Sequence, residues 1–512
     1  MKKRFISFFV VLMAVVLAFS ACRSRAADGE RTLVVALPSF PVSLDNTIAN
    51  EFNSLAIHYN FVETLVTFDG PERNIVPSLA ESWHMPDPQT VIMNLRRGIK
   101  FHNGDEMKAS DVQFSIMRGV PSAQVRILLG VIDSVDIIND YSVQINLNVP
   151  FAPILAHLTH PGAGINSERA FRELGAAEFA NQPVGTGPFK FSSMSLGDYV
   201  ELEKFEDYWG TPPGVDRIRF VVIPESTNRL IEVETGGVHI SYDIAPHNLP
   251  RLRSDPNLAY DLAPVTRIHF MGFNLMSPTA IPLRDLRVRQ AIYHAVDIQA
   301  LVDTVYQGVG KPLYGPLAGI AGVLDFEPVE FNPARARQLL AEAGYPNGFS
   351  VSLWCTSDNQ QEVDTAIIIQ NMLGQVGINV EIVTMEFAIF LSATRQSATG
   401  PGGHDMYVLS WNNMPADPDY GLVLFHSNSI GGGNRFHYSN PALDRILDEA
   451  RAEINPARRT QLYEEAQRIL VYDKPLLFIL HGEELCALSP NITGFVNFPP
   501  RVARLNTVRF TN

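Results

Sequence analysis

The stretch Pro183-Val184-Gly185-Thr186-Gly187-Pro188-Phe189-Lys190 decides how this sequence of 512 residues is interpreted. Its two glycines can adopt backbone angles that residues with side chains avoid, and Pro188 fixes the direction in which the chain leaves the turn. The stretch lacks the glycine and lysine spacing of a phosphate-binding loop. We therefore expect Gly185 and Gly187 to shape a crossover between two parts of the fold and not to hold a phosphate.

Further short motifs lie in a fixed order on both sides of this stretch. They are Pro41-Val42-Ser43-Leu44-Asp45, Phe61-Val62-Glu63-Thr64-Leu65-Val66, Val76–Trp83, Leu95–Gly104, Ala109-Ser110-Asp111-Val112, Tyr208-Trp209-Gly210, Phe273-Asn274 and Asp285–Ile292. Each alone is weak, but together they are hard to obtain by chance. The chain resembles the peptide-type solute-binding proteins of bacterial ABC importers (family 5), the group of the dipeptide-, oligopeptide- and nickel-binding proteins. The likeness runs from about Leu33 to Ile479.

This resemblance implies an α/β fold, a two-lobe clamp of the periplasmic-binding-protein type II kind with a hinge and an extra inserted subdomain. Lobe one would combine residues 31–50, 185–264 and 481–512, the inserted subdomain would be 51–184, and lobe two would be 265–480. The chain would cross between the lobes near Pro264–Ile268 and near Phe478–His481. Trp83 and Trp209 are expected in the core. Closure of such a hinge buries a ligand between the lobes.

The N-terminus has the pattern of an export signal. Lys2, Lys3 and Arg4 precede the uncharged run Phe5–Ala21, which is at the short limit for a membrane span. The run ends in small residues before Cys22, as in the bacterial lipobox, where the cysteine carries a diacylglycerol. We therefore predict a signal peptide over 1–21, lipidation of Cys22, a polar tether over 22–30 and an extracytoplasmic, membrane-anchored lipoprotein.

Composition excludes several classes of protein. Hydrophobic residues make up 46% and charged residues 18% of the sequence, as in a folded globular protein. The formal net charge of −14 disfavours nucleic acid as a partner. Three cysteines cannot form a disulfide framework. With Cys22 lipidated, Cys355 and Cys486 either pair or remain buried thiols, and we expect the second because they fall in different lobes.

Local signals define several elements of the α/β fold. Thr32–Leu37 has the composition of a strand that Pro38 ends. Asn-Pro pairs supply an N-cap and a first-turn proline for three helices. We expect these at Ala334–Ala343, 442–453 and 457–471. A strand at Ser350–Leu353, a helix at Glu362–Val376 and a strand at Ile378–Val383 form one α/β unit.

The segment after Ser410 is the most informative for a ligand. In the peptide binders of this family a tryptophan is followed three residues later by an aspartate that pairs with the peptide amine. Here Trp411 is followed by Asn412, Asn413 and Met414. A buried ammonium without a carboxylate is costly, so either Asp417 or another acid replaces the missing aspartate, or the ligand lacks a free amine there. Asp417 also precedes Pro418, which is typical of a structural turn.

Other candidate ligand contacts come from separate parts of the sequence. Ser39 and Phe40 follow the first strand, and Trp354 ends a strand of lobe two. Asn434 closes a glycine-rich loop that could cover the site or be a plain surface loop. Arg395 could hold a ligand carboxylate in a bidentate pair or be an exposed arginine at a helix end.

The substrate class stays open among a peptide, which we favour, an oligosaccharide or other polar solute, and nickel or a metal chelate. No metalloprotease helix, close-spaced Cys/His set or nucleophile elbow occurs, so we expect no enzyme, no metal site and no cofactor. The expected partners are the small-molecule ligand, the permease subunits of an ABC importer with their ATPase, and the membrane through the lipid anchor. We expect a monomer. A sensor that binds a solute without transporting it fits the same features.

Overall fold

The computed structural model describes residues 31–70, 74–357, 359–395, 403–498 and 502–511. Its largest feature is a sheet of 11 strands that extends through two lobes. The strand order is β15-β14-β16-β12-β17-β11-β1-β10-β9-β8, and β13 (Lys311–Pro312) pairs with β17 off this path. Strands β12 (Ala259–Phe273) and β17 (Leu476–Leu488) are the long central pair that continues from one lobe into the other. The α/β fold with a large mixed sheet confirms the predicted fold class.

Lobe one contains the first half of this sheet and helices on its two faces. Its strands are β1 (Thr32–Leu37), β8 (Phe189–Ser195), β9 (Tyr199–Lys204), β10 (Arg217–Val222) and β11 (Ile240–Ser241). Helix α2 (Phe52–Phe61) packs in one core of the lobe, while α7 (Ser226–Glu234) and α8 (Leu249–Ser254) pack in the other. Strand β1 has the bounds that its sequence predicts.

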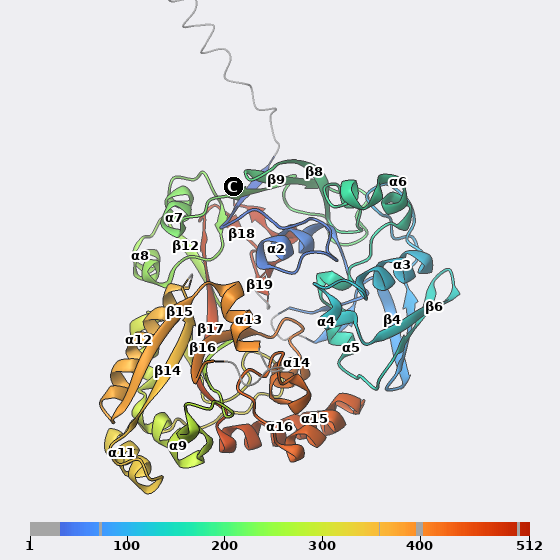
Figure 1. The fold of residues 1–512 in the computed structure, drawn as a ribbon. Helices are drawn as coiled ribbons and strands as arrows, with labels where there is room; N and C mark the ends of the chain where they lie inside the picture. The colour runs from blue at the N-terminus through green and yellow to red at the C-terminus, as the bar shows by residue number, and fades with distance from the viewer. Residues whose placement is uncertain (1–30, 71–73, 358, 396–402, 499–501, 512) are drawn as a thin grey trace, which may run out of the picture.

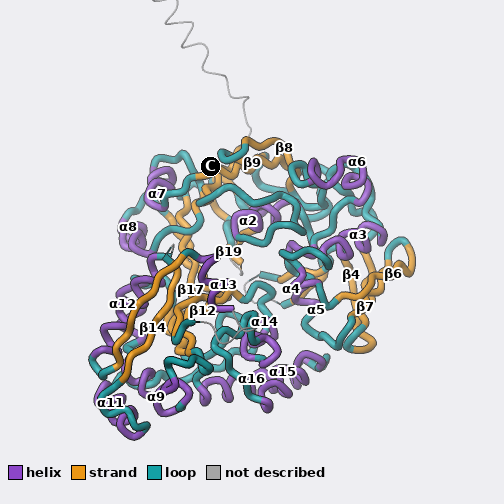
Figure 2. The backbone as a smooth tube through the Cα atoms, in the orientation of Figure 1, coloured by secondary structure: helices purple, strands orange, loops and turns teal. Residues whose placement is uncertain are grey.

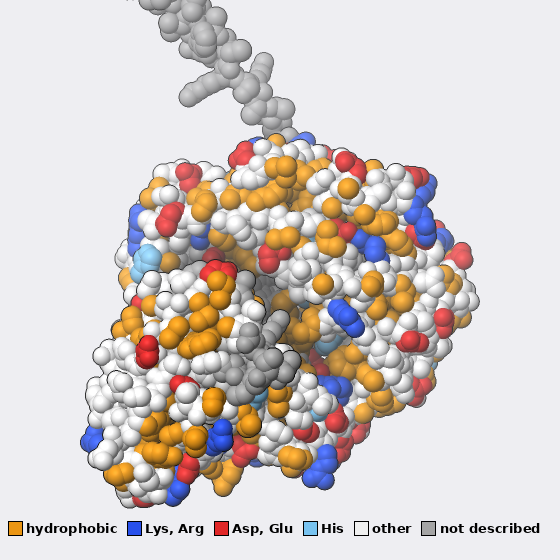
Figure 3. All heavy atoms as spheres, in the orientation of Figure 1, with side chains coloured by type: hydrophobic (Ala, Val, Ile, Leu, Met, Phe, Trp, Pro, Cys, Tyr) orange, Lys and Arg blue, Asp and Glu red, His pale blue; other side chains and the backbone are white. Residues whose placement is uncertain are grey.

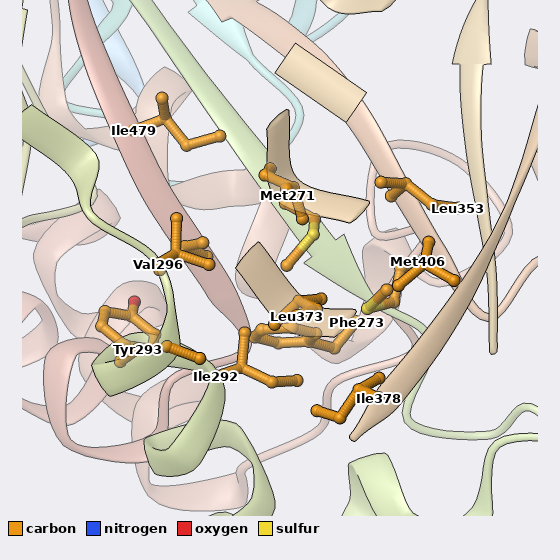
Figure 4. Close-up of a cluster of buried hydrophobic side chains, with 14 of the residues drawn as sticks. Met271, Phe273, Ile292, Tyr293, Val296, Leu353, Leu373, Ile378, Met406 and Ile479 are labelled. Atoms are coloured by element: carbon orange, nitrogen blue, oxygen red, sulfur yellow. The ribbon is translucent and has the colours of Figure 1, made fainter. Parts of the chain in front are cut away.

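Lobe two places helices on both faces of the other half of the sheet (Figure 2). Its strands are β14 (Phe349–Thr356), β15 (Ile378–Met385) and β16 (Met406–Asn412). One core contains residues of α9 (Leu286–Ala295), α10 (Ile298–Val305), α11 (Pro333–Glu342) and α12 (Gln360–Gly374). Figure 4 shows side chains of α9 and α12 beside those of β12 and β14. The other contains residues of α13 (Phe387–Arg395), α14 (Pro418–Leu422), α15 (Pro441–Ala452) and α16 (Pro456–Asp473).

The caps read from the sequence form as expected. The side chain of Asn332 accepts from the backbone N–H of Arg335, and those of Asn440 and Asn455 cap α15 and α16 in the same way. Each of these caps satisfies backbone donors that the first helical turn leaves free. The helices therefore begin and end within two residues of the predicted positions.

The inserted subdomain has its own antiparallel sheet and its own core. The sheet has the order β4-β5-β7-β6, and the core contains residues of both sheet and helices. Its elements are β4 (Ala80–Asp87), β5 (Thr90–Leu95), β6 (Ile132–Asn139), β7 (Ser142–Leu147), α3 (Ala109–Gly119), α4 (Arg126–Leu129), α5 (Ile154–His157) and α6 (Glu168–Phe179). Figure 1 shows this subdomain to one side of both lobes.

The chain leaves lobe one for this subdomain at Glu63. Phe61 and Val62 belong to the core of lobe one, whereas Leu65 and Val66 belong to the core of the subdomain. Because α2 packs in the core of lobe one, we propose a boundary near Glu63 in place of residue 51.

Glu63 joins this exit to the return of the chain. Its carboxylate accepts hydrogen bonds from Thr186 Oγ1 at 2.9 Å, Tyr208 Oη at 2.9 Å and Trp209 Nε1 at 2.8 Å. Burial raises the pKa of Glu63, and the three donors oppose that shift. Trp209 is not a core residue as expected, because 37% of it is exposed and its indole N–H is turned to Glu63.

Gly185 and Gly187 serve this junction in a way that differs from the prediction. Neither has a positive φ. A Cβ on Gly187 would lie 2.6 Å from the carbonyl carbon of Phe61, and one on Gly185 would lie 2.3 Å from its oxygen. His102 completes the contact, since its backbone N–H donates to Gly185 O at 3.0 Å and its ring bonds Gly187 O at 3.1 Å. The glycines are required by the close approach of two backbones.

Two further findings concern the whole described chain. Cys355 and Cys486 are both buried and form no disulfide, which settles the alternative left open by the sequence. Among the residues that the structure describes, no helix has the length and apolar character needed to cross a bilayer.

Gly187→Ala is expected to lower the free energy of unfolding by about 1–3 kcal/mol. The added methyl group would collide with backbone atoms of Phe61, which cannot rotate away as a flexible side chain could. Gly374→Ala is the matched control, since no heavy atom lies within 4 Å of its Cβ position at the end of α12. The control should be neutral or gain up to about 1 kcal/mol. Urea unfolding followed by circular dichroism measures both, and equal loss in the two variants would contradict the role given to Gly187.

Candidate functional site

The loops of both lobes that carry candidate ligand contacts lie beside β12 and β17. We call the point where these two strands pass from one lobe to the other the crossing. Strand β16 runs antiparallel to β12, so that Trp411 pairs with Ile268 and Asn412 with Arg267 at the crossing. Strand β1 runs parallel to β11, whose Ser241 pairs with Ala487 of β17. The C-terminal ends of β1 and β16 therefore face each other across the crossing. Figure 3 shows a hollow between lobe two and the inserted subdomain on the viewed face.

Trp411 joins two parts of the protein. It is partly buried, packs against a core of lobe two and the core of the inserted subdomain, and stacks on Tyr420 with ring centroids 5.3 Å apart and planes at 24°. Its Nε1 is buried and has no hydrogen-bond partner among the described residues. Trp411 therefore has a packing role and also carries an unused donor.

The next three residues form the end of β16 and the start of the turn that follows it. Asn412 Oδ1 accepts from Thr266 Oγ1 at 3.1 Å, and Asn413 Nδ2 donates to the carbonyl of Asp417 at 2.8 Å. Asn413 is buried, and its Oδ1 has no partner among the described residues. Met414 is partly exposed.

Asp417 is engaged in the structure of lobe two. Its carboxylate caps α14 by accepting from the N–H of Asp419 at 2.8 Å, and it accepts two bonds from Arg459 at 2.6 and 2.9 Å. Both side chains are mostly buried. This geometry favours the structural alternative that the sequence left open for Asp417, because each carboxylate oxygen already has a guanidinium donor.

A second ion pair lies beside the first. Asp419 accepts from Arg451 Nε at 3.0 Å and is almost fully buried. Burial raises the pKa of Asp419, although Arg451 opposes the shift. Both acids of this segment are therefore already paired with an arginine.

The remaining predicted contacts differ in how they are used. Ser39 is exposed, and its Oγ accepts from Asn53 Nδ2 at 2.6 Å, while Phe40 packs partly against the core of lobe one. The ring centroids of Trp354 and His404 lie 5.7 Å apart. Asn434 is buried and bonds the backbone of Tyr438 through both side-chain atoms, so it shapes its own loop.

Two predicted residues cannot be placed with their side chains. Arg395 ends α13, and its side chain lies outside the described residues. Cys22 and the predicted signal and tether over 1–30 also lie outside them. Within the described part of the chain, no three His, Cys, Asp or Glu side chains are grouped so that they could hold a metal ion.

A cavity of about 320 Å³ adjoins Trp411 between the inserted subdomain and lobe two. The sequence did not indicate its other walls, which include Ile127, Val149 and Phe151 on one side and Tyr420 and Arg451 on the other. These segments lie far apart in the sequence and share no motif. A polar cavity of about 80 Å³ lies at the crossing itself, between Arg267 and His269 of β12 and the acids at the lobe-one end of β17.

Comparison with known proteins identifies the family. The model of the bacterial extracellular solute-binding proteins, family 5 middle region, matches residues 74–433. The chain belongs to this family. It is 29% identical over 475 residues to the glutathione-binding protein GsiB of Pectobacterium atrosepticum, and the match covers 91% of each chain.

Solved structures extend the likeness to three dimensions. HbpA2 from Haemophilus parasuis matches with a TM-score of 0.85 and 27% identity over 94% of this chain and all of that one. The ABC transporter-associated periplasmic binding protein DppA from Helicobacter pylori, solved with the peptide STSA, matches with a TM-score of 0.78 and 27% identity. That match covers 94% of this chain and 98% of DppA. The predictions of the family, the two-lobe fold and an extracytoplasmic solute-binding protein are confirmed.

Asp417→Ala is expected to lower the free energy of unfolding by about 3–5 kcal/mol without any ligand present, because it leaves Arg459 buried and unpaired. Glu449→Ala is the control, since its pair with Arg458 is half exposed on both sides and should contribute less than about 1 kcal/mol. Chemical denaturation of the ligand-free protein measures the difference. An Asp417 variant as stable as the control would indicate that this carboxylate is not structural.

Proposed function

We propose that this protein is the lipid-anchored binding component of an ABC importer, which captures a short peptide between its lobes and delivers it to the permease. In this proposal it is not an enzyme and acts as a monomer. Cys22 would carry the lipid, and the ligand would contact the segment Trp411–Met414 together with Ser39 and Phe40. Trp354 and Arg395 are further candidate contacts.

The observation that carries the proposal is the position of the β1 and β16 ends on opposite sides of the two crossing strands. A change of angle in β12 and β17 would bring these ends together or move them apart. The register of β12 against β17 shifts between Pro264 and Ile268, so the ladder is interrupted at the crossing. An interrupted ladder is a place where a pair of strands can bend.

The peptide class is supported by the relatives and by the polarity of the site. One relative is named for glutathione and one was solved with the peptide STSA, and both ligands are short peptides. Asp417 and Asp419 are paired with Arg459 and Arg451. Neutral donors and acceptors from Trp411 and Asn413 remain, and these suit the amide groups of a peptide main chain.

A thermal-shift screen tests the ligand class, with a soluble chain that starts after Cys22. The panel holds free-amine peptides, their N-acetylated forms, oligosaccharides, and nickel with and without chelators. A ligand at about a hundredfold its Kd should add roughly 2.7 kcal/mol of stability and raise the Tm clearly. We expect peptides to give this rise. A rise with sugars or metal complexes alone would keep the transport role and reject the peptide.

Cys22→Ala is expected to release the full chain from the membrane fraction of a bacterial host, because the thiol that would carry the lipid is gone. Labelling with a radioactive fatty acid should mark the parent chain and not the variant. Unchanged membrane association and labelling in Cys22→Ala would reject the anchor. Genes for a permease and an ATPase beside this one would favour transport over solute sensing.

A further inference from the structure

The loop between α10 and β13 connects the two lobes by a contact that lies outside both crossing strands. Tyr306 at its start is 3% exposed and belongs to the core of lobe two that contains residues of α9 and α12. Val309 near its end is 7% exposed and belongs to a core of lobe one, with Leu249 and Leu485. Every other member of that core lies within residues 34–36, 221–262 or 485–487. One side chain of lobe two is therefore inserted into lobe one.

The backbone of this loop follows the surface of lobe one closely. Gln307, Gly308 and Gly310 have φ angles of 50°, 86° and 108°. A left-handed φ is unfavourable for a residue with a side chain such as Gln307, and it persists where surrounding contacts hold the backbone. A Cβ on Gly308 would lie 3.8 Å from Leu249 Cδ2, so the loop runs beside α8. The loop is a tight turn with a defined position.

A carboxylate at the lobe-one end of β17 holds the end of the loop. The backbone N–H of Gly310 donates to Glu483 Oε2 at 3.1 Å, and the side chain of Glu483 is only 9% exposed. Lys311 Nζ lies 3.8 Å from Glu483 Oε1, but Lys311 is 75% exposed, so this ion pair adds little. The loop is therefore held to lobe one by an apolar contact and by one buried hydrogen bond.

In lobe two, this loop and Trp411 lie on opposite faces of β12. Successive side chains of a strand point to opposite faces. Ile268 belongs to the core against which Trp411 packs, whereas the ring of His269 has its centroid 5.3 Å from that of Tyr306. We call the face with Trp411 the front of the crossing and the face with Tyr306 its rear.

The same division holds along β1 in lobe one. Leu37 belongs to the core against which Phe40 packs, whereas Ala36 belongs to the core that contains Val309. The candidate ligand contacts Trp411 and Phe40 therefore lie at the front, and the Val309 contact lies at the rear. The polar cavity of about 80 Å³ at the crossing is lined in part by Val309. This cavity leaves open space beside the loop at the rear.

Contacts at the rear of a hinge oppose closure at its front. When two lobes turn about β12 and β17 so that their front surfaces approach, their rear surfaces move apart. The side chain of Val309 would then leave the core of lobe one, and the hydrogen bond from Gly310 to Glu483 would lengthen. Both changes cost free energy, because apolar surface returns to water and a buried carboxylate loses a donor.

We propose that the loop 307–310 is a latch at the rear of the hinge, which holds the lobes at the angle of this structure and sets the affinity for the ligand. A ligand that closes the front must supply the free energy that releases the latch, so a weaker latch gives tighter binding. Val309 is the positioning residue of this latch, because it acts on affinity without touching the ligand. The inference rests on the proposed binding of a ligand between the lobes.

A pair of variants weakens the same core with and without an effect on the latch. Val309→Ala removes two methyl groups from the contact between the lobes. Val233→Ala is the matched control, because Val233 is 3% exposed in the same core but lies on α7 of lobe one. Val309→Thr and Val233→Thr form a second pair in case the first does not fold, since they keep the side-chain shape and bury a hydroxyl.

The distance between the lobes tests the latch without any ligand. Spin labels are placed on Leu196→Cys in lobe one and Ile281→Cys in lobe two, two exposed positions, in a soluble chain that starts after Cys22. We expect the Val309 variant to add a second distance that the parent lacks, and the Val233 variant to keep the parent distribution. An unchanged distribution in the Val309 variant, or the same change in both variants, would overturn the latch.

Stability and affinity separate a latch from a plain packing contact. Urea unfolding is measured without ligand, and calorimetry uses glutathione and the peptide STSA as probes. We expect both variants to lose stability, but only the Val309 variant to bind a probe at least threefold more tightly than the parent. Equal or weaker binding by the Val309 variant would contradict the latch. If neither probe binds the parent, the result counts against the proposed function alone, and the spin-label distances decide the latch.

Discussion

The hydrogen bonds to the buried carboxylate of Glu63 fix the arrangement on which the rest of the structure depends. A carboxylate out of water is costly unless donors surround it, and here Thr186, Tyr208 and Trp209 supply them. Thr186 lies between the two glycines whose backbone touches that of Phe61. One carboxylate therefore joins the segment that leaves lobe one to the segment that returns to it. The inserted subdomain is held to lobe one at this point.

The attachment of the subdomain to lobe one determines which part of the protein β12 and β17 could move. With the subdomain fixed to lobe one, lobe two is the part that a bend in β12 and β17 would move. The contact of Tyr420 with the subdomain core and the Ala152–Arg451 hydrogen bond would then form or break as the lobes close. The cavity beside Trp411 lies between these two parts of the protein.

Sequence alone was sufficient wherever a structural cause is local. The Asn-Pro caps at Asn332, Asn440 and Asn455 act on their own first turns, so the helices appear where expected. The motif around Gly187 was recognised, but its physical cause was not, because the backbone of Phe61 that it touches lies far away in the sequence. The boundary that we propose near Glu63 depends in the same way on contacts between distant segments. Such a boundary depends on which core a helix packs in, and the sequence of the helix does not show that.

The residues of the candidate site also differ in whether a local motif marks them. Trp411 is a candidate because a motif marks it, whereas His157, Phe151 and Tyr420 carry no motif and become neighbours of Trp411 only when two parts of the chain meet. For Asp417 the sequence left a ligand contact and a structural turn open, and its ion pair with Arg459 favours the second. With its acids paired, the segment offers neutral dipoles to a ligand. In the proposed function such dipoles would recognise amides and hydroxyls by position and not by charge.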